Sequence, residues 1–241
     1  MNYRNEIYNE YVSKHSQQLY GKKDISDIKK QFPVWNKYYG RHLPKNKNIQ
    51  ILEIGCGNGG FLYYLKKSGY SNYHGIDISD EQINQAKKLG LLNVEIADIK
   101  TYLEDTTKKY DVIIARDIIE HFKKQEIIDI IKLIFNTLST NGKLIIQTPN
   151  AEGPFGSRYR YRDFTHEIAF TRSSLSNILR ITGFKKILFY PTEPVPRYSL
   201  KSAVRFLLWK TIEVVLKFYV LVENGSAEGI YTQNIIAVAK K

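Results

Sequence analysis

A short, largely apolar run that ends in a glycine-rich turn constrains this chain more than any other stretch. The run is IQILEI (49–54), and the turn GCGNGG (55–60) follows it directly. Four apolar residues within six predict a short strand buried on both faces of a sheet. Alternating glycines remove the Cβ atoms from the inside of the turn, so a ligand can lie against backbone N–H groups at the start of a helix. The stretch therefore predicts a nucleotide-binding α/β fold.

The glycine turn alone leaves the kind of nucleotide open. Gly55, Gly57 and Gly60 also satisfy the G-x-G-x-x-G pattern of dinucleotide-binding proteins, with Asp77 at a spacing suited to a ribose hydroxyl. The segment EIGCGNG (53–59) is more specific, because it resembles the E/D-x-G-x-G-x-G signature of class I S-adenosylmethionine-dependent methyltransferases. The resemblance implies a cofactor site that includes Glu53, Gly55, Cys56, Gly57 and Gly59. We expect Cys56, which has no partner residue in view, to be a small packed side chain rather than a catalytic thiol.

Later segments agree with this resemblance in order and spacing. Strands are predicted at 73–77 and 92–96. Asp77 ends the first of them, and because Ser79 or Asp80 caps the next helix, we expect the Asp77 carboxylate to be free to bind the ribose, with Ile78 beside it. The resemblance also implies that Asp98 binds the adenine amino group, with Ile99 beside the ring.

A further predicted strand, 110–115, precedes the segment RDIIEHF (116–122). This segment resembles the family's post-strand segment, which commonly ends in Glu-His. Arg116 departs from the small or polar residue that the family favours there, and we expect it to contact the cofactor or an anionic acceptor.

The order of the elements predicts an α/β fold, namely a Rossmann-like, doubly wound sheet of seven strands with the last strand antiparallel. The last three strands are expected at 143–148, 184–190 and 232–239. We expect residues 1–48 to form two or three short helices, broken near Pro33, that make an N-terminal helical cap. The whole chain, 1–241, is predicted to be a single methyltransferase domain. Its parts are the cap (1–48), a cofactor-binding core (49–149), a substrate insertion (150–170) and a C-terminal part (171–241) that contains a long helix (200–222).

The insertion carries the residues that we expect to select the substrate. In SRYRYRD (157–163), arginine and tyrosine alternate. An extended conformation would therefore place Arg158, Arg160 and Arg162 on one face and Tyr159 and Tyr161 on the other. Three guanidinium groups on one face suit a phosphate or a carboxylate, and an exposed hairpin with solvated arginines is the alternative.

The net charge of +12 is unevenly distributed along the chain. Residues 1–48 carry +6, residues 49–167 carry −1 and residues 168–241 carry +7. Positive charge in the segments that flank the core suits an anionic substrate, a nucleic acid or an anionic membrane surface, and a lysine-rich composition that only aids solubility is the alternative. The chain has no RNA-binding module and no uninterrupted basic stripe. We therefore expect a small anionic molecule as the partner and no nucleic acid.

The helix predicted at 200–222 is apolar on more than one face, but Arg205, Lys210, Glu213 and Lys217 interrupt it. These charges predict that it is not a transmembrane segment. We expect a homodimer contact or a cap, with attachment to a membrane surface less favoured. A polar N-terminus and a single cysteine predict a cytoplasmic protein without a secretory signal or an internal disulfide.

These features predict an enzyme that transfers a methyl group from S-adenosylmethionine and releases S-adenosylhomocysteine. DFTH (163–166) resembles the D-x-x-H element of methyltransferases in cell-surface polysaccharide and small-molecule pathways. The resemblance implies that His166 lies near the transferred methyl group. O-methylation of a sugar or nucleotide sugar in capsule or polysaccharide biosynthesis is favoured, and N-methylation of an amino-acid-derived or phosphoramidate-type acceptor is the alternative.

His166 is the first candidate for a general base, because a neutral imidazole titrates near working pH. Asp163 is expected to orient it or to bind the substrate, and His121 is the second candidate. A metal-assisted reaction using Asp117, Glu120 and His121 is an alternative, but the sequence shows no separate cluster of hard oxygen ligands, so no metal is predicted. Two other classes remain open, an NAD-dependent Rossmann oxidoreductase and a noncatalytic nucleic-acid-binding protein.

Overall fold

A computed structural model describes residues 24–196 and 199–241 of the chain. The part of the predicted cap that precedes residue 24 lies outside the described residues. In chain order, the elements are α3 (Ile25–Tyr38), η2 (Gly40–His42), β1 (Ile51–Ile54), α4 (Gly60–Lys67), β2 (Tyr73–Asp77), α5 (Asp80–Lys88), β3 (Val94–Ile96), α6 (Ile99–Asp105), β4 (Tyr110–Arg116), η3 (Ile119–His121), α7 (Lys124–Thr137), β5 (Leu138–Pro149), α8 (Gly156–Arg160), α9 (Arg172–Ile181), β6 (Lys186–Pro191), α10 (Leu200–Asn224) and β7 (Asn234–Lys240).

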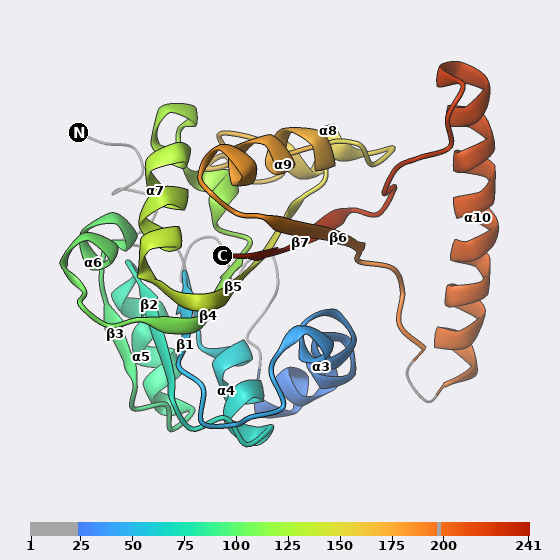
Figure 1. Ribbon diagram of the computed structural model, residues 1–241. Coiled ribbons are helices and arrows are strands. Elements are labelled where there is room, and N and C mark those ends of the chain that lie inside the picture. Colours follow the sequence, from blue (N-terminus) through green and yellow to red (C-terminus); the bar gives the residue numbers. More distant parts are fainter. Residues whose placement is uncertain (1–23, 197–198) are drawn as a thin grey trace.

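One seven-stranded sheet, in the order β3-β2-β1-β4-β5-β7-β6, organises the fold (Figure 1). Strands β1 to β5 pair in parallel, whereas β7 lies between β5 and β6 and runs antiparallel to both. The predicted Rossmann-like sheet with an antiparallel last strand is therefore confirmed.

Helices cover both faces of the sheet, as the largely apolar strands require. Ile51, Val112 and Ile145 pack on one face with residues of α3, α4 and α5. Leu52, Ile113 and Leu144 point to the other face, toward α6, α7 and α9. In Figure 1 the first group of helices lies below the sheet, and α7 and α9 lie above it.

The carboxyl ends of the central strands bring distant parts of the chain together. Ile54, the last residue of β1, pairs with Ala115 near the end of β4. β5 lies on the other side of β4 and continues to Pro149. The glycine turn after β1, the segment after β4 and the insertion after β5 therefore meet at one edge of the sheet, where open α/β sheets bind ligands.

The predicted helix break near Pro33 is wrong, because helix α3 continues through this residue. Asp24 and Asp27 form a capping box at its start. Phe32 lies 5.2 Å from Tyr64 of α4, measured between ring centroids, and Trp35 lies 5.6 Å from Phe61. This aromatic packing holds the helix across the proline, whose missing N–H normally interrupts a helix.

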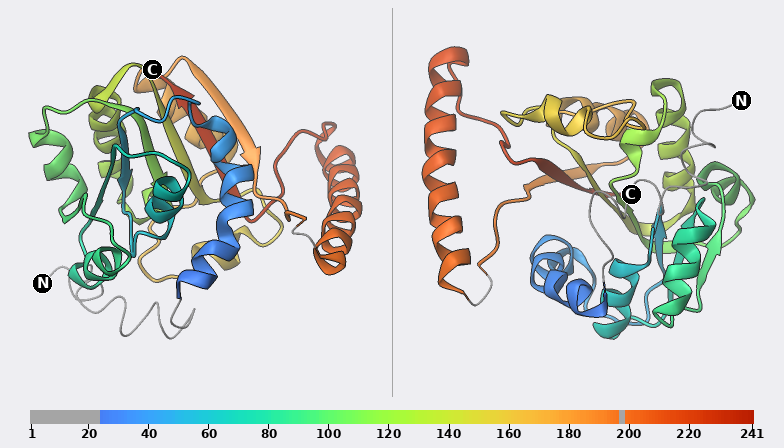
Figure 2. Two further views of the ribbon diagram at one scale, coloured as in Figure 1. Left: turned by 90° about the horizontal axis from the view of Figure 1, so that it is seen from below. Right: turned by 180° about the vertical axis from the view of Figure 1, so that it is seen from behind.

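Helix α10 stands apart from the sheet in both views of Figure 2. None of its residues is buried. Lys210 of α10 pairs with Glu193, which also pairs with Lys37 of α3. No helix of residues 24–196 and 199–241 is long and apolar enough to cross a membrane.

A cavity of about 740 Å³ lies between α3 and α10, and none of the predicted site residues lines it. Its walls include basic side chains from both flanking segments of the chain, namely Lys29, Lys30, Lys201 and Arg205. Part of the positive charge that flanks the core therefore lines this cavity, rather than the edge of the sheet where the active site is predicted.

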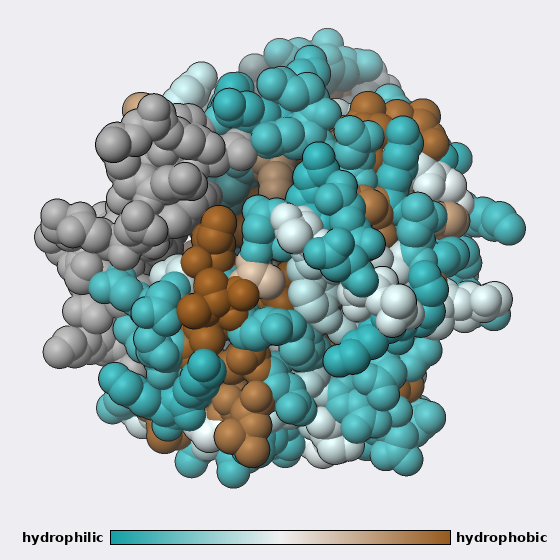
Figure 3. All heavy atoms as spheres, turned by 90° about the vertical axis from the view of Figure 1, so that its left-hand side faces the viewer, coloured by the Kyte–Doolittle hydropathy of each residue, from teal (hydrophilic) through white to brown (hydrophobic). Residues whose placement is uncertain are grey.

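The opposite side of the molecule, which carries α5, α6 and α7, is mostly hydrophilic (Figure 3). A strip of hydrophobic atoms crosses this side. Three exposed apolar side chains, Ile78, Leu92 and Ile96, come from β3 and the loops near it. Single exposed apolar residues are normal, but Ile78 and Ile96 also flank the predicted cofactor residues Asp77 and Asp98.

Candidate active site

The glycine turn has the geometry of a ligand cradle. Gly55, Gly57 and Gly59 have φ values of 65°, 54° and 74°, which favour glycine. A Cβ atom on Gly55 would lie 2.8 Å from the Ile118 side chain, and one on Gly59 would lie 2.5 Å from Leu91. On Gly57 it would meet nothing closer than 3.8 Å. The turn thus packs tightly at its two ends and is open at Gly57, which fits a bound nucleotide.

Asp77 supports this turn from the end of β2. Its carboxylate accepts hydrogen bonds from the backbone N–H of Gly57 at 2.8 Å and of Ser79 at 2.9 Å. Ser79 caps α5 as expected, but both oxygens of Asp77 already hold the loops on either side, and ribose binding by Asp77 stays a prediction. Each carboxylate oxygen has a second acceptor site, so a ribose hydroxyl can still be bound.

Glu53 and Arg116 form a buried ion pair beneath the turn. Nη1 of Arg116 lies 3.3 Å from Oε1 of Glu53. The guanidinium group also lies 4.6 Å from the Phe61 ring and 5.2 Å from the Tyr39 ring, measured from Cζ to the ring centroid. Ion pairing and aromatic contacts therefore hold the Arg116 guanidinium group in place, while its buried Nε has no hydrogen-bond partner among the described residues.

The second oxygen of Glu53, Oε2, is buried and has no hydrogen-bond partner among the described residues. Burial raises the pKa of Glu53 to about 7, although Arg116 acts in the opposite direction. A buried acceptor without a partner is costly, and a cationic ligand group would satisfy it. The ammonium group of the methionine part of S-adenosylmethionine is such a group, so Glu53 fits this cofactor.

The remaining predicted cofactor residues differ in exposure. Asp98 is exposed and caps α6, since one of its oxygens accepts from the Thr101 N–H at 3.0 Å. Ile78 is exposed, whereas Ile99 is buried in the core. Cys56 is buried, and burial raises the pKa of its thiol, as expected for a packed side chain.

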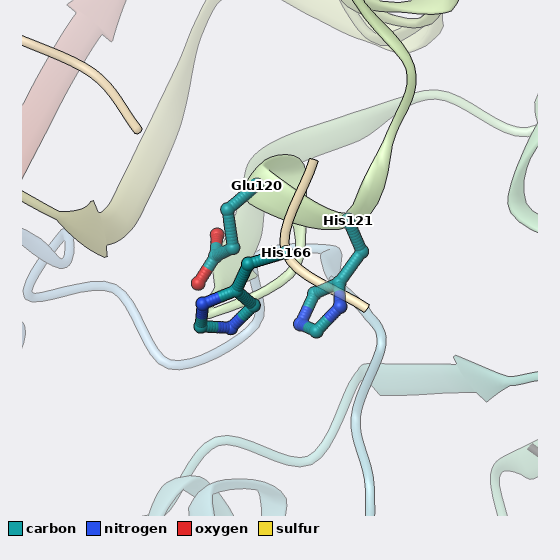
Figure 4. A group of neighbouring side chains, drawn as sticks. All are labelled: Glu120, His121 and His166. Carbon is teal, nitrogen blue, oxygen red and sulfur yellow. The ribbon is translucent and has the colours of Figure 1, made fainter. Parts of the chain in front are cut away.

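The two predicted base candidates, His121 and His166, meet next to the turn, together with Glu120 from the metal-assisted alternative. Glu120 and His121 lie on η3 after β4, and His166 lies in the insertion after α8. One potential ligand atom from each of the three residues lies within 4.8 Å of the other two, and the two imidazole rings are 4.7 Å apart between centroids. Figure 4 shows the Glu120 carboxylate and both rings converging on one region. Two sequence segments predicted separately thus form one cluster.

Hydrogen bonds fix this cluster from outside. Thr165 donates its hydroxyl hydrogen to Asp163 at 2.7 Å, and its oxygen lies 2.7 Å from Nδ1 of His121. Asp163 thus contacts His121 through Thr165, whereas the sequence suggested that it orients His166 or binds the substrate. Nδ1 of His166 instead lies 3.1 Å from the backbone oxygen of Tyr159.

Sequence reasoning did not identify Thr148 or Thr165. Thr148 donates to Oε2 of Glu120 at 3.0 Å. Thr165 lies within the DFTH segment, but its contact with His121 depends on a loop conformation that no local pattern specifies. Glu120 is fully buried, and burial together with neighbouring Asp117 raises the pKa of its carboxyl well above the usual range.

The alternating arginines do not share one face, because residues 156–160 form the short helix α8 rather than an extended strand. Arg158 and Arg162 are exposed. Arg160 is half-buried, donates to the Glu167 backbone oxygen at 3.4 Å, and keeps a buried Nε without a partner among the described residues. Tyr161 is largely exposed, and Tyr159 is half-buried. The structure thus separates the predicted substrate residues into different environments.

A seven-stranded sheet of this order, with a glycine cradle after its first strand, defines a class I S-adenosylmethionine-dependent methyltransferase fold. The sequence profile of the family described as "Methyltransferase domain" matches residues 28–188, which is more than half of the chain. The chain therefore belongs to this family. Membership confirms the resemblance seen in the sequence and, with it, the predicted enzyme class and cofactor.

Two curated proteins illustrate the similarity. Probable (S)-tetrahydroprotoberberine N-methyltransferase 2 of Papaver bracteatum is 34% identical over 116 residues, which cover 45% of this chain and 32% of the relative. Phosphoethanolamine N-methyltransferase of Plasmodium falciparum (isolate 3D7) is 27% identical over 153 residues, which cover 59% of this chain and 56% of the relative. The chain thus spans only part of the length of these relatives.

Solved structures resemble the fold over nearly the whole chain. A SAM-dependent methyltransferase from Archaeoglobus fulgidus aligns with a TM-score of 0.68 and 21% identity, over 96% of this chain and all of that one. Phosphoethanolamine N-methyltransferase 2 of Haemonchus contortus, in complex with S-adenosyl-L-methionine, aligns with a TM-score of 0.61 and 14% identity, over 97% of this chain and 60% of that one. At these identities the comparison supports the fold alone.

Proposed function

We propose that the chain transfers a methyl group from S-adenosylmethionine to a small anionic acceptor, with a hydroxyl group as the favoured nucleophile. One observation supports this proposal above all. Glu120, His121 and His166 form an acid–imidazole cluster. The glycine turn contacts the segment that carries two of these residues, since Gly55 packs against Ile118, two residues before Glu120. A cofactor in the cradle and an acceptor at the imidazoles would then be neighbours.

S-adenosylmethionine supplies an electrophilic methyl carbon on a positively charged sulfur, which keeps the bonding electron pair and leaves as a neutral thioether. The protein has to align the acceptor oxygen with that carbon, exclude water and remove the hydroxyl proton. His166 is proposed to accept this proton at Nε2, because its Nδ1 is held by the Tyr159 backbone oxygen. The His121 ring lies 4.7 Å from the His166 ring, measured between centroids, so His121 is the second candidate for the base.

The anionic end of the acceptor is assigned to Arg160. Its buried Nε without a partner is a donor suited to a phosphate or carboxylate oxygen. A sugar phosphate or nucleotide sugar offers both a hydroxyl and such an anion. A role in capsule or polysaccharide biosynthesis is proposed on this chemistry and on the DFTH segment alone.

A second candidate is N-methylation of a phosphorylated amine. The relative from Plasmodium falciparum and a structural neighbour are both named phosphoethanolamine N-methyltransferases. The acidic side chains beside the imidazoles would suit an amine. This acceptor needs no strong base once the amine is neutral, which separates the two candidates experimentally.

The test uses purified full-length chain with S-adenosylmethionine carrying a labelled methyl group. Sugar phosphates, nucleotide sugars and phosphoethanolamine would be screened for label incorporation. For a hydroxyl acceptor, His166→Ala should lower kcat by roughly 10²- to 10⁴-fold, the usual contribution of a positioned base. A nearly active variant would favour the amine, and no labelled product from any class would reject the proposed acceptors.

Helix α10 is proposed to form a homodimer contact. It exposes many large apolar side chains along its length, including Leu207, Leu208, Val215 and Phe218. A contiguous apolar surface of this kind usually marks an interaction site.

A further inference from the structure

The acid–imidazole cluster of Glu120, His121 and His166 has the composition of a metal site. Two imidazoles and one carboxylate are a common set of ligands for first-row transition metals, with positions left open for a substrate. One potential ligand atom from each residue lies within 4.8 Å of the other two. Figure 4 shows the three side chains side by side, with Glu120 and His121 on η3 and His166 on the insertion.

The hydrogen bonds of His121 determine which of its nitrogens can bind a cation. Thr165 has one hydroxyl hydrogen, and at 2.7 Å its bond to the Asp163 carboxylate uses that hydrogen. The Thr165 oxygen therefore accepts from Nδ1 of His121, 2.7 Å away. Nδ1 then carries the proton and Nε2 the lone pair.

His166 has the same tautomer for a different reason. Its Nδ1 lies 3.1 Å from the backbone oxygen of Tyr159, and a carbonyl oxygen can only accept. The lone pair of His166 is therefore also on Nε2. Metal-binding histidines typically donate their other ring N–H to a carboxylate, a carbonyl or a similar acceptor, as both of these residues do.

Glu120 provides an independent indication of a ligand. The residue is fully buried, and Thr148 donates to its Oε2 at 3.0 Å. The other oxygen, Oε1, is buried and has no hydrogen-bond partner within the described part of the chain. A buried acceptor left without a partner is costly, and a bound cation would remove that cost.

We propose that Glu120, His121 and His166 bind one divalent transition cation, such as Zn²⁺, Co²⁺ or Mn²⁺. The sequence-based prediction left the metal out, although it considered a metal-assisted reaction with Glu120 and His121 as an alternative. Bonds of about 2.0–2.2 Å at a tetrahedral angle place two ligand atoms of one cation roughly 3.5 Å apart, so the side chains would have to close by as much as about 1.3 Å on binding. Imidazole ligands favour these cations over Mg²⁺, which prefers oxygen.

The catalytic role of the cation rests on the proposed methyl transfer, whereas its binding does not. With three protein ligands, an open position can take the acceptor hydroxyl, whose pKa a divalent cation lowers. The hydroxyl proton would then leave to solvent, and the two histidines would act as ligands. In the metal-free protein His166 would be the base itself.

The binding test uses the untagged full-length chain after treatment with a chelator. Calorimetric titration with Zn²⁺, and the visible absorbance of added Co²⁺, should show one site, and Zn²⁺ should raise the melting temperature. Glu120→Gln keeps the size of the side chain but removes the anionic ligand, and His166→Asn removes an imidazole. Each should weaken Zn²⁺ binding by at least about tenfold, as even changes around metal ligands commonly do.

His74→Ala is the matched control, because His74 also lies against a glutamate, with Nε2 2.8 Å from Oε1 of Glu95, but outside the cluster. Its Zn²⁺ affinity should equal that of the wild type. Equal Zn²⁺ affinity of folded Glu120→Gln, His166→Asn and wild type, or the absence of binding by the wild type, would overturn the inference. Methyl transfer that resists a chelator, without metal binding, would overturn the metal site and leave the proposed function intact. Tight metal binding without methyl transfer would support the metal site and reject the proposed function.

Discussion

Nδ1 of His121 lies 2.7 Å from the hydroxyl oxygen of Thr165, 44 residues further along the chain. This contact joins the segment after β4 to the insertion after β5. Backbone hydrogen bonds strengthen the junction, since the N–H groups of Glu167 and Ile168 both donate to the backbone carbonyl oxygen of Glu120. The insertion is therefore held against the cluster by its own backbone and by one hydroxyl group.

The Thr165 hydroxyl is predicted to position His121 rather than to touch the substrate. Thr165→Ala should lower kcat by about 10- to 100-fold, a typical cost of removing a partner that orients a ligand or base. The KM for S-adenosylmethionine should stay unchanged, and Thr165→Ser should restore kcat because it keeps the hydroxyl. Steady-state kinetics of the three proteins test this. Equal loss in the Ala and Ser variants would assign Thr165 to packing alone.

Arg160 is predicted to bind the anionic end of the acceptor. A charge-assisted hydrogen bond is worth roughly 1.5–3 kcal/mol, so Arg160→Gln should raise the acceptor KM by about tenfold or more. Arg158 lies on the same short helix but is exposed. Arg158→Gln is thus the matched control and should leave KM unchanged. Unchanged KM in both variants would place these arginines in solvent contacts only.

Glu53 is predicted to make cofactor binding depend on pH. Only the ionised carboxylate pairs with an ammonium group, and the pKa of Glu53 is about 7. The affinity for S-adenosylhomocysteine should therefore fall as the pH drops below 7, by up to about tenfold per pH unit. Calorimetry from pH 5.5 to 8.5 measures this, and Glu53→Gln should bind weakly with a flat profile. A flat wild-type profile would exclude the ammonium contact.

The raised pKa of Glu53 also predicts how the stability of the unliganded chain depends on pH. A carboxyl whose folded pKa lies above its unfolded value binds more protons when folded, so its contribution to stability is lost as the pH rises from about 4.5 to about 7. The wild type should lose more stability than Glu53→Gln across this interval. Denaturant unfolding at pH 5 and pH 8 compares them, and an equal change in both would contradict the burial of Glu53.

Helix α10 is predicted to mediate a homodimer. Sedimentation should show a dimer for the wild type, and replacing Leu208 and Val215 by Glu should give a folded monomer, because charges at these exposed apolar positions oppose burial. Lys201→Glu at the start of the same helix is the control and should remain dimeric. A monomeric wild type at all concentrations would assign α10 another role.

The sheet could be predicted from the sequence because its strands are short, apolar and bounded by glycines and turns. The strand at 73–77 begins and ends where predicted, and the antiparallel final strand also follows the prediction. The glycine turn identified the cofactor edge for the same reason, since only a few residue types allow its positive φ values.

Tertiary contacts decided the features that the sequence could not specify. Pro33 predicts a break, but aromatic packing of Phe32 and Trp35 against α4 keeps α3 continuous. The alternating arginines predict a strand, but residues 156–160 turn into a helix. His121 and His166 could each be identified as candidates, whereas their contact depends on how the insertion folds back onto β4.

Calorimetric titration of S-adenosylhomocysteine into the full-length chain tests the central claim most directly. The wild type should bind it and should not bind NAD. Gly57→Val should abolish or strongly weaken binding, because it fills the open side of the cradle. Gly90→Val carries a similar positive φ strain, at 77° against 54°, on an exposed turn outside the site, and it should bind normally. Failure of the folded wild type to bind S-adenosylhomocysteine, or equal affinity of Gly57→Val and wild type, would contradict the account.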